Sequence, residues 1–222
     1  MVEEWIGVSS QRLLEASTQT LYMLGWSLFL GTLLGIPLAL LLVLTRPNGL
    51  KANGLVYAVI NGVVNIVRSI PFIILLVFIQ PLTREIVGTG IGMNAAIVPL
   101  VFYIGPFIGR LIESALLEVD AGILEAAKSM GANTWQVIRY FLLPEAKASI
   151  YLAMATGTVG LLGATAMAGT IGGGGVGDLA LTYGYQRFND VLMLVTVIVL
   201  VIFVQCIQGL GNKLADRARN KA

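Results

Sequence analysis

The chain has 222 residues, 57% of them apolar, and a mean hydropathy of +0.86. A soluble domain of this length cannot bury so much apolar surface, so the excess must face lipid. The net charge of +2 is too small to indicate a nucleic-acid partner, and the absence of histidine excludes imidazole metal sites and histidine acid–base catalysis.

Five segments have the roughly 20 largely apolar residues that a membrane-spanning helix needs. They cover residues 19–44, 55–82, 90–112, 148–170 and 190–211. Backbone polar groups in lipid must be satisfied internally, and the alternation of a membrane β-barrel is absent, so an all-α integral membrane protein with five transmembrane helices is predicted. Glu3 and Glu4 replace the basic start of a cleavable signal peptide, so the first segment should be retained. Cys206 is the single cysteine, so no intrachain disulfide can form.

The connections between the predicted spans alternate between the two sides of the membrane, and basic residues are divided unevenly between the two sides. One set carries Arg46, Lys51, Lys128, Arg139, Lys147, Lys213, Arg217, Arg219 and Lys221. The other set carries only Arg12, Arg84 and Arg187. Because Lys and Arg are enriched in cytoplasmic loops, the first set is predicted to be cytoplasmic. With five spans, the N-terminus is then outside and the C-terminus inside.

The second apolar segment carries a polar stripe. Asn61, Asn65 and Arg68 recur at i, i+4 and i+7, so they share a face that should meet protein or water rather than lipid. They are candidates for the solute path or its gate, and the alternative is that Arg68 only ties helices together. Pro71 should kink or break the helix that follows.

The end of the third segment carries a possible ion pair. Arg110 and Glu113 have the i, i+3 spacing of neighbours on a helix. We interpret them as a solvated structural contact.

The connection over residues 113–149 has the pattern of two short helices that meet at a glycine. Asp120 can cap the first helix, and Gly131 stands where a left-handed C-terminal residue is usual. Asn133 and Gln136 resemble a capping box that starts the second helix, which Pro144 should end. The predicted apolar stripes are Ile123, Ala127 and Met130 on the first helix, and Trp135, Ile138, Phe141 and Leu142 on the second. Such a unit is either a hairpin that packs on its own protein or a rigid knob for a partner.

The spacing in this connection favours the second alternative, because it resembles the EAA loop of the permease subunits of ABC importers. That pattern is E-A-A, three residues, G, nine residues and I-x-L-P, and Phe141 stands here in place of the isoleucine. The matching residues are Glu125, Ala126, Ala127, Gly131, Leu143 and Pro144. The resemblance implies a cytoplasmic loop that docks on a separate ATPase. The predicted coupling residues are these six together with Met130, Trp135, Ile138 and Phe141.

The resemblance extends from about Asn61 to the C-terminus and is nearest to methionine-importer permeases, on stretches such as NIVRSIPFIILLV and PFIGRLIESALLE. It implies the type I ABC importer permease fold over residues 1–222, in the bacterial inner membrane. It also implies a homodimer with two ATPase subunits and an extracytoplasmic substrate-binding protein, with no cofactor or metal in the permease. The methionine substrate rests on the resemblance alone, and another amino acid or small solute is the alternative.

Met167 is a bulky thioether among Ala166, Ala168 and Gly169 at the end of the fourth segment. It could narrow a path where two copies meet, or it could be core packing. The glycines of 172–177 do not form a phosphate loop, because no Lys-Ser or Lys-Thr follows and no strand precedes them, and a flexible, close-packed outer loop is expected. A secondary transporter, a channel or a membrane enzyme would need intramembrane carboxylates or a catalytic set that the sequence does not display.

Overall fold

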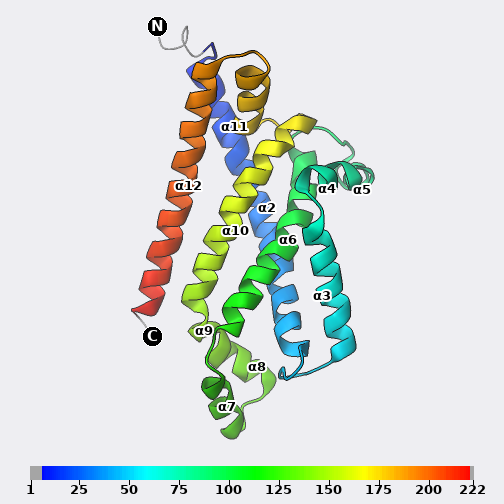
Figure 1. The fold of residues 1–222 in the computed structure, drawn as a ribbon, viewed down its shortest axis with the longest axis vertical. Helices are drawn as coiled ribbons and strands as arrows, with labels where there is room; N and C mark the ends of the chain where they lie inside the picture. Colours follow the sequence, from blue (N-terminus) through cyan, green and yellow to red (C-terminus); the bar gives the residue numbers. More distant parts are fainter. Residues whose placement is uncertain (1–6, 221–222) are drawn as a thin grey trace.

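The computed structural model describes residues 7–220, so Glu3, Glu4 and Lys221 lie outside the described residues. Within that range every regular element is a helix (Figure 1). The elements are α2 (Ser10–Thr45), α3 (Gly54–Ser69), α4 (Phe72–Phe78), α5 (Gln80–Val87), α6 (Met93–Leu117), α7 (Ala121–Ser129), α8 (Thr134–Gln136), the π-helix η1 (Val137–Leu142), α9 (Leu143–Glu145), α10 (Lys147–Ala168), the 3-10 helix η2 (Gly169–Ile171), α11 (Gly175–Asp178), the π-helix η3 (Leu179–Tyr185) and α12 (Asp190–Arg219).

Four helices in the described range are long and apolar enough to cross a membrane: α2, α6, α10 and α12. The fifth expected span is a broken one, because α3 and α4 meet at a bend of 103°. The break falls between Ser69 and Phe72, at the proline that the sequence singles out, and residues 80–82 already belong to α5. Four to five candidate spans thus agree with the predicted all-helical membrane fold.

Close contact between α2 and α6 organises the bundle. A Cβ added at Gly35 would lie 2.8 Å from the Gly105 carbonyl oxygen, and one added at Gly109 would lie 3.2 Å from the Gly35 carbonyl oxygen. Small residues let two backbones approach in this way, which is how helices commonly associate in lipid. Leu100, Ile104 and Ile108 of α6 are fully buried in the core that results.

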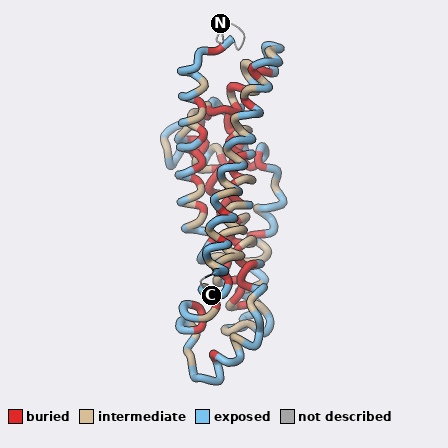
Figure 2. Tube along the Cα trace, turned by 90° about the vertical axis from the view of Figure 1, so that its left-hand side faces the viewer, coloured by how far each residue is buried: buried red, intermediate tan, exposed pale blue. Residues whose placement is uncertain are grey.

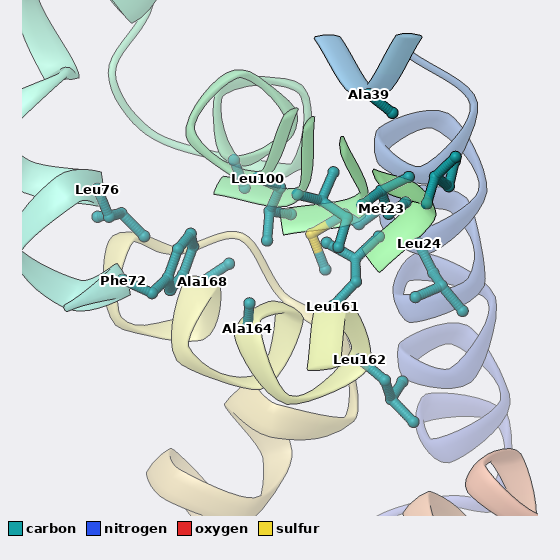
Figure 3. Packing of buried hydrophobic residues seen from close by; sticks show 14 of the residues in the cluster. Met23, Leu24, Ala39, Phe72, Leu76, Leu100, Leu161, Leu162, Ala164 and Ala168 are labelled. Carbon is teal, nitrogen blue, oxygen red and sulfur yellow. The ribbon is translucent and has the colours of Figure 1, made fainter. Parts of the chain in front are cut away.

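The core extends from this contact to α4 and α10. Figure 3 shows Met23 and Leu24 of α2 facing Leu100, with Leu161, Ala164 and Ala168 of α10 beside them and Phe72 of α4 on the far side. The outer faces of the helices remain exposed (Figure 2), and on α12 large apolar side chains such as Val197, Val201 and Ile202 are about half exposed. An apolar outer face of this kind suits a bundle that is surrounded by lipid.

The two ends of the bundle differ. Helices α7 and α8 project at one end, together with the α2–α3 connection and the last turns of α12 (Figure 1). The start of α2, helix α11 and η3 lie at the opposite end. Apart from Lys221, which lies outside the described residues, the basic residues that the sequence assigns to one side therefore lie toward the end that carries α7 and α8.

The glycine-rich stretch at the other end is closely packed against α2 and α10. The Gly175 N–H donates to Gln19 Oε1 at 2.8 Å, and the Val176 N–H donates to Thr20 Oγ1 at 2.9 Å. A Cβ added at Gly177 would lie 2.2 Å from the Ala166 Cα, so only glycine fits against α10 there. The expectation of close packing is confirmed, because the glycines allow close backbone contact.

Candidate coupling loop and pathway residues

The first half of the loop is a capped helix with a fixed end. Asp120 Oδ1 accepts a hydrogen bond from the Gly122 N–H at 2.7 Å at the start of α7. At the other end Gly131 has φ +77°, the Ala132 N–H donates to the Ala127 carbonyl at 3.1 Å, and the Gly131 N–H donates to the Lys128 carbonyl at 2.9 Å. This pair of bonds is the Schellman motif, so both predicted ends of α7 are confirmed.

The second half begins with a complete capping box. The Gln136 N–H donates to Asn133 Oδ1 at 3.0 Å, and the Asn133 N–H donates to Gln136 Oε1 at 2.8 Å. The backbone then continues through α8, η1 and α9. Two capped helices joined by a left-handed glycine hold a fixed angle, because each end has its own hydrogen bonds.

Pro144 does not end this second helix, so that prediction is wrong. It lies in the first turn of α9, and the helical chain turns only at Ala146, directly before α10. The preceding turn is a π-helix, in which the Leu143 N–H donates to the Ile138 carbonyl. The helical backbone continues through Pro144, although proline has no N–H to donate to the preceding turn.

The predicted coupling residues divide between an inner and an outer face of the loop. Ala127 and Ile138 are buried, and Phe141 and Leu143 are half-buried. The outer residues are Glu125, Ala126, Met130, Gly131, Trp135 and Pro144. Met130 and Trp135 are each 68% exposed, so they lie on the outer side of the loop, apart from the buried Ala127 and Ile138 with which the sequence pattern grouped them.

A third large side chain joins this outer surface without having been predicted. Tyr140 is 67% exposed and lies in η1. The wider turn of a π-helix changes which residues share a face, so an α-helical period cannot assign its direction. Met130, Trp135 and Tyr140 are thus three large, exposed side chains on the projecting end of the molecule.

A hydrogen bond joins the two ends of the loop where it meets the bundle. Ser149 Oγ donates to Glu118 Oε2 at 2.9 Å, which links the start of α10 to the residue that follows α6. The loop is therefore attached to two core helices at once, and neither residue was singled out by the sequence.

The polar stripe of α3 is bound to α6. Arg110 donates to Asn61 Oδ1 at 2.6 Å and to Asn65 Oδ1 at 2.8 Å, and it pairs with Glu113 at 2.7 Å. Glu113 is only 3% exposed, so the interpretation of this pair as a solvated contact is wrong. Buried carboxylates need a cation and hydrogen bonds, and here the same arginine also satisfies two amides of the neighbouring helix.

The remaining pathway candidates lie apart from this network. Arg68 is exposed, with its guanidinium carbon 5.7 Å from the centre of the Phe107 ring. Met167 lies in the last turn of α10 and is 48% exposed, outside the hydrophobic core. The structure thus joins Asn61 and Asn65 through Arg110 but does not bring Met167 to them. Residues 7–220 contain no cluster of carboxylate or thiol groups that could hold a metal.

Comparison with known proteins is consistent with this arrangement. A protein from Vibrio cholerae, named as a probable D-methionine transport system permease protein MetI, is 47% identical over 99% of this chain and 98% of its own. The methionine import system permease protein MetP of Bacillus subtilis is 44% identical over 95% of this chain and 96% of its own. A solved chain of the MetNI methionine ABC transporter in an inward-facing conformation superposes with a TM-score of 0.92 at 42% identity, over 94% of this chain and 97% of that chain. Residues 27–220 match the model of the binding-protein-dependent transport system inner membrane component family, and the chain belongs to that family.

Proposed function

We propose that this chain is the permease subunit of an ATP-driven methionine importer in the bacterial inner membrane. The observation that carries the proposal is the projecting loop, because Met130, Trp135 and Tyr140 are large side chains there that stay about two-thirds exposed among residues 7–220. The methionine substrate rests on the names of the relatives from Vibrio cholerae and Bacillus subtilis. Residues 1–222 act as one permease domain, and the chain hydrolyses no ATP itself.

The working assembly is a homodimer with two ATPase subunits and an extracytoplasmic substrate-binding protein. Exposed apolar side chains at the centre of a convex end are suited to a groove in a partner. The predicted coupling residues provide both parts of such a joint. Glu125, Ala126, Met130 and Trp135 offer the contact, while Ala127 and Ile138 hold the loop on its own protein.

The mechanism is alternating access driven from this loop. Closure of the ATPase dimer would draw the two loops together, and each loop would move as a unit because both of its helices are capped. The bond between Glu118 and Ser149 carries that movement to α6 and α10. Arg110 then links α6 to Asn61 and Asn65, so α3 would follow.

Uptake measurements test the proposal directly. Expressed with its neighbouring ATPase and binding protein, the chain should restore uptake of labelled methionine to a methionine auxotroph that lacks its own importers. An ATPase subunit should co-purify with the chain. Methionine transport by the isolated chain without ATP would instead indicate a channel or secondary transporter, and transport of another amino acid alone would overturn the substrate.

The N-terminus is expected outside and the C-terminus inside. In a Cys206→Ser background, a cysteine at Asn133 should resist a membrane-impermeant thiol reagent added to intact cells and react after permeabilisation. A cysteine at Arg187, at the opposite end of the bundle, should react in intact cells and serves as the matched control. Labelling of position 133 from outside would contradict the orientation and the ATPase docking together.

Met167 is expected to narrow the closed path near the two-fold axis of the dimer. Its side chain is half exposed, next to Gly163, around which an added Cβ would meet no atom within 4 Å. In a Cys206→Ser background, Met167→Cys should crosslink to its second copy under mild oxidation, and Met167→Ala should raise ATP hydrolysis that is not coupled to uptake. Absence of crosslinking together with normal coupling would leave Met167 a packing residue.

A further inference from the structure

A groove of about 320 Å³ lies between α10 and α12, in the half of each helix that is nearer to α7 and α8 (Figure 1). The residues that line it are Leu152, Ala155, Thr156 and Val159 of α10 and Gln208 and Asn212 of α12. A Cβ added at Gly211 would overlap the Ala155 Cβ, so the two helices touch beside the groove. The groove therefore combines apolar surface with three uncharged polar side chains, on two helices that can cross the membrane.

The polar groups of this groove are available to a ligand. The Thr156 hydroxyl donates to the Leu152 carbonyl at 3.0 Å, which leaves the hydroxyl oxygen able to accept a hydrogen bond. No hydrogen bond joins the side-chain amides of Gln208 and Asn212 to residues 7–220, and both side chains are exposed. An amide without a hydrogen-bond partner is costly in lipid, so polar residues of membrane helices usually face protein or a water-filled path. The groove is thus better suited to a polar solute than to lipid tails.

One face of α10 connects the groove to Met167. Leu152, Thr156, Val159, Gly163 and Met167 follow one another at spacings of four, three, four and four residues, which places them in one row along the helix. Thr156, Gly163 and Met167 are exposed, whereas the buried residues of α10 lie on its other side. A helix rises about 1.5 Å per residue, so Thr156 lies ~16 Å from Met167 along α10. The groove therefore shares a face with the residue that is proposed to narrow the path.

An amino acid has the charged groups that this groove can satisfy. The side-chain oxygens of Thr156, Gln208 and Asn212 can accept hydrogen bonds from an ammonium group, and the two amides can donate to a carboxylate. The apolar part of the lining can pack against an apolar side chain. We infer that Thr156, Gln208 and Asn212 bind the ammonium and carboxylate groups of the transported amino acid, between Met167 and the end of the bundle that carries the coupling loop. This inference rests on the proposed importer function.

The lack of charge in the lining suits a site that must release its solute. None of the six residues that line the groove is ionisable. A carboxylate or a guanidinium would hold one end of the solute through charge-assisted hydrogen bonds, which are about twice as strong as neutral ones. A transport path needs binding that is weak enough for the solute to leave. The site should therefore recognise the zwitterion as a whole rather than one of its charges.

Protection of a cysteine in the groove tests the inference on the whole complex of permease and ATPase. In a Cys206→Ser background, Val159→Cys places a thiol in the lining and leaves the three polar residues intact. Methionine should slow alkylation of this thiol in the absence of nucleotide, as measured by mass spectrometry of the permease. Methionine methyl ester and N-acetylmethionine, each of which lacks one of the two charges, should protect far less. Leu210→Cys, exposed on α12 outside the groove, is the matched control, and methionine should not change its alkylation.

Three substitutions test the polar groups separately. Thr156→Val, Gln208→Met and Asn212→Leu each remove hydrogen-bonding groups with little change in size, so the others remain informative if one variant does not assemble. Each should raise the methionine concentration needed for protection roughly 3- to 10-fold, the effect of one lost neutral hydrogen bond. Gln205→Met makes the same change at an exposed amide of α12 that does not line the groove, so it should leave that concentration unchanged.

Four outcomes would overturn the inference: no protection by methionine, equal protection by the methyl ester, equal effects of Gln205→Met and Gln208→Met, or a Val159→Cys thiol that never reacts. In the last case a second copy of the chain would cover the groove. Uptake of labelled methionine is measured on the same complex after reconstitution with its binding protein. Normal uptake without protection overturns this site alone, whereas absence of uptake overturns the proposed function and the site with it.

Discussion

Arg110→Met is expected to destabilise the permease by about 3–5 kcal/mol, the usual cost of removing one partner from a buried ion pair. The change leaves the Glu113 carboxylate, which is 3% exposed, without its cation. It also removes the guanidinium that donates to Asn61 Oδ1 and Asn65 Oδ1, so α3 loses its polar attachment to α6. The measurement is the fraction of monodisperse protein that survives a series of heating steps in detergent.

A double variant separates the effect of the unpaired buried charge from the effect of the changed side-chain shape. Arg110→Met with Glu113→Met replaces both partners by side chains of similar length, and such replacements of buried pairs are often neutral or stabilising. It should recover most of the lost thermal stability but not the attachment of α3, so uptake should stay impaired. If Arg110→Met alone is as stable as the native protein, the pair does not hold these helices together.

The long apolar helices could be predicted from the sequence because their signal is local. A run of about 20 apolar residues specifies a span without reference to its neighbours. The bend at Pro71 could also be predicted, since proline removes a donor and restricts the residue before it. The angle of 103° between α3 and α4 could not, because it depends on how α4 packs against α6 and α10.

Three of the four ends of the loop helices were predictable for the same reason. Asp120, Gly131 and the pair Asn133 and Gln136 each satisfy backbone groups within a few residues, so their chemistry can be identified from sequence. Such local bonds do not give the directions of Met130 and Trp135. An apolar residue on a short helix has the same pattern whether it faces its own core or a partner, so only the resemblance to the EAA loop indicated a partner contact, and in the structure both side chains are 68% exposed.

The contacts of Arg110 with α3 were not predicted from the sequence. Its spacing from Glu113 identified the pair, and the stripe on α3 was identified separately, but no sequence period connects residues 45 and 49 positions apart. Burial converts a contact that would be weak in water into one that fixes the position of a helix. The link between the stripe and α6 is therefore a tertiary feature that the sequence could not supply.

Gly131→Val is expected to abolish methionine uptake while membrane insertion stays normal. A left-handed backbone costs a residue with a side chain on the order of 1–2 kcal/mol, and a β-branched residue is among the least tolerant. No atom lies within 4 Å of a Cβ added at Gly131, so the penalty comes from φ +77° rather than from a clash. Relief of that strain would rotate the second loop helix and misplace Trp135 and Tyr140 relative to Met130.

Two further variants make this test specific to the backbone. Gly131→Asn should keep most of the uptake, because asparagine tolerates the left-handed conformation better than other residues with side chains. Gly209→Val places the same side chain on α12 at a glycine with equal open space and without a positive φ, so uptake should be normal. Uptake and ATPase co-purification are measured together for all three. Normal uptake and normal co-purification in Gly131→Val would mean that the angle between α7 and α8 plays no part in docking. Equal loss of uptake in Gly131→Val and Gly131→Asn would mean that position 131 tolerates no side chain, whatever its backbone conformation.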